Sequence, residues 1–179
     1  AYGSAKRTIY YSVSVAGFSA MGFLIVIMLG FQALYGYVDV MFALLSALFM
    51  VGMSAGAITV RYMRIKGPLK LALAFDILTA ALAVIAVFVL DIALAVYVVC
   101  LLAGVLSGAQ FAAVSSAFEQ RGGISAGGRL YAFDLAGSFA GALVFAIVIV
   151  PVAGLWGALL LVAVVKVFSA VLIGRVRNA

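Results

Sequence analysis

Three ionisable side chains, Asp76, Asp134 and Lys166, lie within stretches that are otherwise apolar. A charged group in hydrocarbon costs at least about 2.5 to 3.5 kcal/mol on insertion scales, and it is usually paired or functional. Two interpretations stay open: an ion pair between Asp134 and Lys166 that fixes helix register, or carboxylates that bind a proton or a cation in a half-channel. Gln32 and Gln110 are further polar residues in apolar stretches, and we interpret both as interhelical hydrogen-bonding groups.

Several kinds of catalytic or cofactor site are excluded by residue type. The chain has no histidine, so it offers no bis-histidine haem ligands, no histidine metal site and no histidine base. It also lacks a Walker loop and a CxxC motif. Its single cysteine, Cys100, has no partner for an intrachain disulfide, and we interpret it as a small buried hydrophobe. We therefore expect no cofactor, no metal and no catalysis by this chain alone.

The elements that must position these residues are membrane-spanning helices. The 179-residue chain is 69% hydrophobic and 9% charged, with a mean hydropathy of +1.38, far outside the composition of soluble domains. A spanning helix needs roughly 20 apolar residues, so the length accommodates about six. The net charge of +6 comes from basic residues at the ends of apolar segments, which fits a membrane and not nucleic acid.

The sequence predicts an all-α membrane protein, a bundle of six transmembrane helices forming one domain over residues 1–179. Polar and glycine-rich breaks separate the apolar segments, and a β-barrel is excluded by their length. The chain begins with Ala1 in place of Met, which suggests processing or a longer parent. The expected helices cover residues of about 13–34, 40–60, 68–90, 92–118, 129–150 and 153–173.

The basic residues predict the orientation. They fall at the ends of the segments that would share one side of the membrane, whereas the opposite loops carry Asp39 and Asp91. Because cytoplasmic loops are enriched in lysine and arginine, we expect both termini in the cytoplasm. The residues counted are Lys6, Arg7, Arg61, Arg64, Lys66, Lys70, Arg121, Arg129, Arg175 and Arg177.

Pairs of glycines at a spacing of four predict where helices approach closely. Such pairs let two backbones come together in lipid. Three expected spans carry one: Gly52 with Gly56, Gly104 with Gly108, and Gly137 with Gly141. Asp134 shares a helix face with Gly137 and Gly141, so we expect its carboxylate to point into the bundle.

Several stretches resemble the transmembrane domain of membrane-bound spermidine-synthase-like proteins, the fused polyamine aminopropyltransferase family. They are GFSAMGFLIVIMLGFQALYGYV, LFMVGMSAGA and GGRLYAFDLAGSFAGALVFAIVIVPVAGL. The positions that match the family's pattern are Gly128, Arg129, Tyr131, Asp134, Gly137, Gly141, Pro151 and Gly154. The resemblance implies a bundle distantly similar to half of a major-facilitator transporter. This chain does not contain the family's soluble catalytic domain, so the resemblance gives it no active-site residue.

These observations lead to one expected function and two alternatives. The first is a non-catalytic membrane subunit that anchors or assembles a membrane or soluble protein partner. Its other expected contacts are lipid and, as a possible homo-oligomer, further copies of this chain. The second is a small cation or polyamine transporter that acts as a dimer of six-helix halves. The third is a quinone-handling subunit whose cofactors lie on neighbouring chains. The expected location is a bacterial inner membrane.

Overall fold

A computed structural model describes residues 2–36, 39–63, 67–119 and 127–178. The described residues are helical almost throughout and contain no strand. The elements are α1 (Tyr2–Tyr35), α2 (Asp39–Tyr62), α3 (Pro68–Val89), α4 (Ala93–Glu119), α5 (Gly127–Val144), the π-helical turn η1 (Phe145–Ile149) and α6 (Val150–Asn178). The all-helical prediction is confirmed.

Five of these helical stretches are long and apolar enough to cross a membrane, which fits an integral membrane protein. The last of these stretches, Gly127–Arg175, contains both of the segments predicted at 129–150 and 153–173, and it is interrupted at one residue. That stretch bends at Gly154, whose φ of 70° and ψ of 178° are not helical. The first helix also begins at Tyr2 and not near Val13. Of the predicted basic positions, Arg64, Lys66 and Arg121 lie outside the described residues.

Glycines in a left-handed conformation mark three of the turns between helices. Gly36 follows α1 with a φ of 74° and donates its backbone N–H to the carbonyl of Gln32. Gly67, with a φ of 93°, precedes Pro68 at the start of α3. Proline suits a first turn because its missing N–H has no partner there. Gly154 takes the corresponding place between the two arms of the last stretch.

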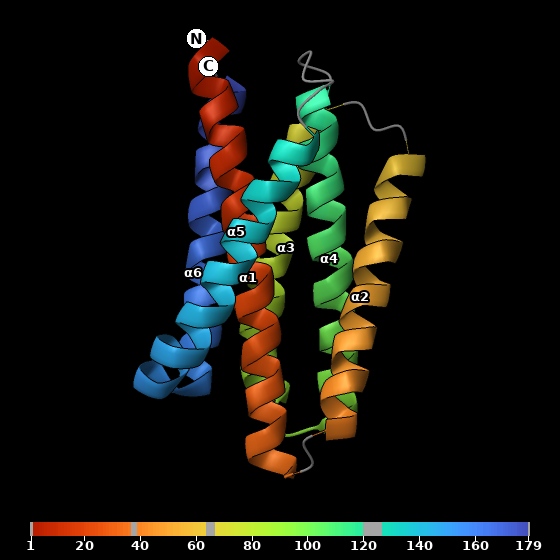
Figure 1. The fold of residues 1–179 in the computed structure, drawn as a ribbon, viewed down its shortest axis with the longest axis vertical. Coiled ribbons are helices and arrows are strands. Elements are labelled where there is room, and N and C mark those ends of the chain that lie inside the picture. Colours follow the sequence, from red (N-terminus) through yellow and green to blue (C-terminus); the bar gives the residue numbers. More distant parts are fainter. Residues whose placement is uncertain (1, 37–38, 64–66, 120–126, 179) are drawn as a thin grey trace.

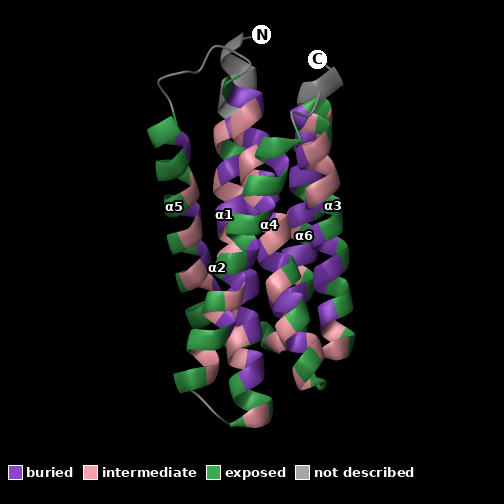
Figure 2. Cartoon of the chain, turned by 90° about the vertical axis from the view of Figure 1, so that its right-hand side faces the viewer, coloured by how far each residue is buried: buried purple, intermediate pink, exposed green. Residues whose placement is uncertain are grey.

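Four helices form the centre of the bundle and two lie at its edges. In Figure 1, α1, α3 and α5 run from the end that holds both termini, and α2, α4 and α6 run back. The central helices α1, α6, α3 and α4 each contact the next in a closed ring, whereas α2 packs mainly on α4 and α5 mainly on α1. Figure 2 shows the buried residues on the inward faces, and mostly exposed or half-buried ones on α5.

The packing repeats itself with the direction of the chain inverted. The contacts of α1, α2 and α3 are equivalent to those of α4, α5 and α6. The packing of α2 on α4 corresponds to that of α5 on α1, and the packing of α3 on α4 corresponds to that of α6 on α1. Corresponding helices run in opposite directions in Figure 1. The two halves are therefore related by a pseudo-two-fold axis perpendicular to the helices, an arrangement known from membrane proteins with inverted repeats.

Individual residue contacts obey the same relation. The rings of Tyr10 and Phe118 lie 5.6 Å apart at 53°, and those of Tyr97 and Phe31 lie 5.5 Å apart at 50°. One shift in numbering takes Tyr10 to Tyr97 and Phe31 to Phe118, so the two pairs are equivalent. The glycine motifs of α2 and α5 are alike as well, with a shift two residues smaller: GMSAGA, beginning at Gly52, matches GSFAGA, beginning at Gly137.

Candidate functional site

The polar side chains at the centre of the bundle form one enclosed group, which we call the polar cluster. Its members are Asp76 of α3, Gln110 of α4, and Lys166 and Ser169 of α6. Asp76, Gln110 and Lys166 are 0% exposed and Ser169 is 1% exposed. Since three helices contribute to the polar cluster, it ties α3, α4 and α6 together.

Each side chain of the polar cluster has a hydrogen-bond or ion-pair partner within the cluster. Lys166 Nζ lies 3.2 Å from Asp76 Oδ1 and donates to Gln110 Oε1 at 2.5 Å. Gln110 Nε2 donates to Asp76 Oδ1 at 2.6 Å. Ser169 Oγ donates to Asp76 Oδ2 at 2.8 Å. Among the buried side chains that the structure describes, Ser12 Oγ is the one polar atom without a partner. Satisfaction of this kind is what makes a buried ion pair tolerable.

The polar cluster separates two apolar cores. Phe23, Ala83 and Leu159 belong to the larger core, and Ala72 and Phe118 to the smaller one nearer the termini. The pseudo-two-fold relation takes the four cluster positions to three residues of the larger core and the buried Thr79. They are Phe23 for Gln110, Thr79 for Lys166, Leu82 for Ser169 and Ala163 for Asp76. Asp76 and Lys166, one from each half, thus have no charged counterpart under the pseudo-two-fold relation.

The ion pair differs from the expected one. Lys166 pairs with Asp76, so the expected pair with Asp134 is wrong. Asp134 is half-buried on α5 and lies against α1, where its backbone carbonyl and Oδ1 would both meet a Cβ on Gly17. The reason is geometric, since α6 packs on α3 and α1 whereas α5 packs on α1.

Three other candidate residues lie away from the polar cluster. Gln32 is exposed in the last turn of α1, so it is not the deep polar group that we expected. Arg129 and Tyr131 are exposed at the start of α5.

Ser169 was not anticipated, although its position three residues after Lys166 places it on the same helix face. The described residues contain no group of three or more histidine, cysteine or acidic side chains that could hold a metal.

All three glycine pairs lie in contacts between helices of this chain. Gly52 and Gly56 lie against the backbone of α4 at Leu101 and Val105, and a Cβ on either glycine would collide with those carbonyl oxygens. Gly104 and Gly108 lie against Phe49 and Met53 of α2 in the same way. Gly137 and Gly141 lie against Ser14 and Phe18 of α1. Each peripheral helix is therefore attached through glycines, as small residues permit in lipid.

A second row of small residues on α5 faces outward. Gly128, Ala132, Ala136 and Ala140 follow one another at a spacing of four, and all are exposed. Ala136 and Ala140 also line an apolar groove of about 560 Å³ formed by α1, α5 and one residue of α6. The other lining residues are Tyr11, Ser14, Val15, Phe18, Phe133, Gly137 and Val165. The outer face of α5 is thus flat along the row and hollowed beside it.

No protein-family model, curated protein or solved structure matches this chain. The resemblance to the spermidine-synthase-like membrane domains therefore remains a prediction from the motifs quoted above.

Proposed function

We propose that this chain is a non-catalytic membrane scaffold of six spans that holds a partner's transmembrane helix on the outer face of α5. The bend at Gly154 supports six spans, because it divides the 49-residue stretch Gly127–Arg175 into two arms that run in opposite directions (Figure 1). The basic residues at the end that holds the termini support a cytoplasmic location for both.

The exposed row on α5 is the observation that carries the scaffold. Helices associate in lipid through small residues that let their backbones approach, because burying apolar side chains there brings no hydrophobic gain. The three glycine pairs are already used between the chain's own helices. The row of Gly128, Ala132, Ala136 and Ala140, with the groove beside it, is an exposed small-residue face that a partner helix could contact.

Crosslinking in native membranes tests the scaffold. In a Cys100→Ser background, Ala136→Cys should form a crosslinked species of higher mass, because the partner's helix covers this position. Ala81→Cys is the matched control, since Ala81 is exposed on α3, outside the row. Equal crosslinking at both positions, or none at Ala136, would remove the support for a partner on α5.

A cation carrier is the second candidate, and the inverted repeat favours it. Carriers built from inverted repeats bind their substrates near the bilayer midplane between the repeats. The polar cluster joins α3 of one repeat to α4 and α6 of the other. The ammonium of Lys166 would then occupy the position at which the ammonium of a substrate binds Asp76. Uptake of a labelled polyamine into proteoliposomes, present in wild type and lost in Asp76→Asn, would establish this function, and no uptake by wild type would exclude it.

A further inference from the structure

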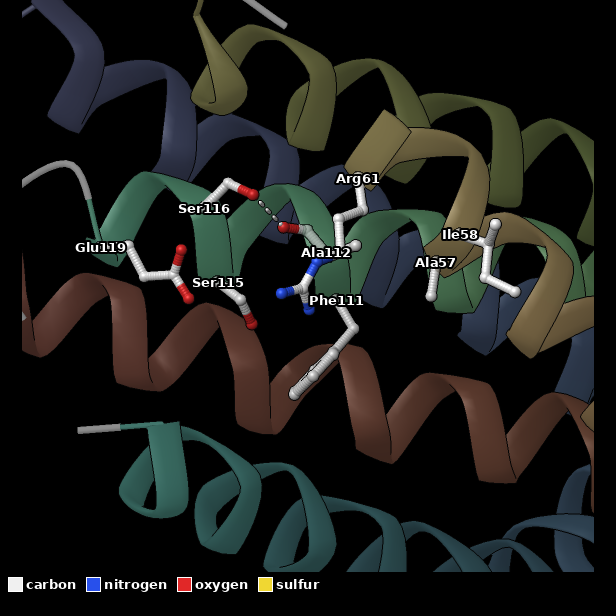
Figure 3. A pocket seen from close by; sticks show the side chains of 8 residues that line it. All are labelled: Ala57, Ile58, Arg61, Phe111, Ala112, Ser115, Ser116 and Glu119. Carbon is white, nitrogen blue, oxygen red and sulfur yellow. Dashed lines mark hydrogen bonds between the residues drawn. The ribbon is translucent and has the colours of Figure 1, made fainter. Parts of the chain in front are cut away.

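A hollow of about 310 Å³ lies between α2 and α4, close to the ends of both helices. Figure 3 shows the side chains that line it: Ala57, Ile58, Arg61, Phe111, Ala112, Ser115, Ser116 and Glu119. None of them belongs to the polar cluster or to the row on α5. This hollow is therefore a separate feature, which we call the α2–α4 pocket.

The pocket changes from apolar to charged along the helices. Phe111 lines it about two turns and Ala57 about one and a half turns from the end of its helix, and Arg61 lies in the last turn of α2. Glu119 is the final residue of α4, and Ser115 lies one turn before it. Such a gradient matches the boundary of a bilayer, where the hydrocarbon gives way to the headgroups over a few ångströms.

Two opposite charges border the same space without pairing with each other. The ion pair found among the described residues is that of Lys166 with Asp76, so Arg61 and Glu119 are farther apart than 4.0 Å. In Figure 3, the guanidinium of Arg61 and the carboxylate of Glu119 lie on either side of the Ser115 hydroxyl. Ser116 Oγ donates to the carbonyl of Ala112 at 2.9 Å. The charges are thus spaced for a ligand that carries both signs.

We propose that the α2–α4 pocket binds the phosphoethanolamine headgroup of a phospholipid. The guanidinium of Arg61 would bind the phosphate, for which its planar fork of donors is suited. The carboxylate of Glu119 would accept hydrogen bonds from the ammonium group. Phe111 and Ile58 would contact the first carbons of the acyl chains.

The same arrangement discriminates against the other common headgroups. A choline group carries the same charge, but it has no N–H to donate to Glu119. A glycerol headgroup has no ammonium, so its phosphate would pair with Arg61 while the Glu119 carboxylate is left without a cationic partner. The pocket should therefore prefer phosphatidylethanolamine to phosphatidylcholine and phosphatidylglycerol.

Binding of short-chain lipids to the purified full chain in detergent tests the proposal. Dissociation constants would be measured for the dioctanoyl forms of the three lipids. Wild type should bind the ethanolamine lipid about tenfold more tightly than the others, the effect of roughly one charge-assisted hydrogen bond. Equal binding of all three lipids, or tighter binding of the glycerol lipid, would overturn it.

Two variants and a control separate the roles of the charges. Arg61→Gln should weaken binding of all three lipids, and Glu119→Gln should abolish the preference for ethanolamine while keeping the phosphate contact. Arg129→Gln removes an exposed basic residue of α5 and should leave the preference unchanged. A melting curve for each variant establishes that it is folded, and Glu119→Gln decides the question if Arg61→Gln does not fold. An unchanged preference in folded Glu119→Gln would overturn the proposal.

Soluble phosphoethanolamine distinguishes a lipid from a free ligand. The soluble compound lacks the acyl carbons that contact Phe111 and Ile58, so it should bind more weakly than the lipid and compete with it. Binding as tight as that of the lipid would show that the pocket takes a soluble metabolite instead and would overturn the lipid assignment.

Discussion

Removing the ammonium of Lys166 should strongly destabilise the bundle. In Lys166→Met, Asp76 would keep its hydrogen bonds from Gln110 and Ser169 and lose its counter-ion at 3.2 Å. Both members of the pair are 0% exposed, so water cannot replace the lost partner. Breaking a buried pair costs about 3 to 5 kcal/mol.

The size of the effect can be followed by thermal unfolding in detergent. A chain of this length loses about 2 to 4 °C of Tm per kcal/mol, so Lys166→Met should melt about 10 °C below wild type. Asp134→Asn is the matched control, because Asp134 is half-buried and belongs to no ion pair among the described residues. It should lower the Tm much less.

The double variant tests the physical reason for the loss. Asp76→Asn combined with Lys166→Met removes both charges, so the two changes should be strongly non-additive and most of the stability should return. If the two single losses simply add, the side chains do not interact. If Lys166→Met has the same Tm as wild type, the polar cluster does not hold α3, α4 and α6 together.

The remaining predictions concern packing, symmetry and sidedness. Gly56→Leu or Gly108→Leu should detach α2 from α4 and lower the Tm sharply, whereas Gly127→Leu, with nothing within 4 Å, should be tolerated; equal tolerance would show that the close contact is absent. Tyr10→Leu and Tyr97→Leu should cost similar amounts, roughly 0.5 to 1.5 kcal/mol beyond the lost area, and very different costs would contradict the repeat. In a Cys100→Ser background, single cysteines at Asp39 and Asp91 should react with an impermeant reagent from outside and those at Tyr62 and Gly127 from inside; labelling of all four from one side would contradict six spans.

The helices and their close contacts could be predicted from the sequence because they depend on local composition. Apolar length marks a span, Pro68 marks a start, and glycines four apart mark a close approach, as Gly56 against Val105 shows. The break between the predicted segments 129–150 and 153–173 falls at Gly154, slightly later than predicted, because Pro151 is accommodated in the first turn of α6.

The members of the polar cluster could be predicted more easily than their pairing. Asp76, Gln110 and Lys166 each stand out in an apolar segment. Which carboxylate meets Lys166 depends on helix order, and the sequence does not state that α6 packs on α3 while α5 packs on α1. Lys166 therefore pairs with Asp76 even though Asp134 lies nearer in sequence.

The proposed scaffold has a partner's helix on α5, and the mass of the intact particle released from native membranes tests this most directly. Native mass spectrometry of wild type should show the chain together with a protein partner or a second copy. Ala136→Leu together with Ala140→Leu should release the chain alone, because the branched side chains would prevent a close approach along the row. A wild-type chain that carries lipid and no protein, or the same complex in the double variant, would contradict the proposal.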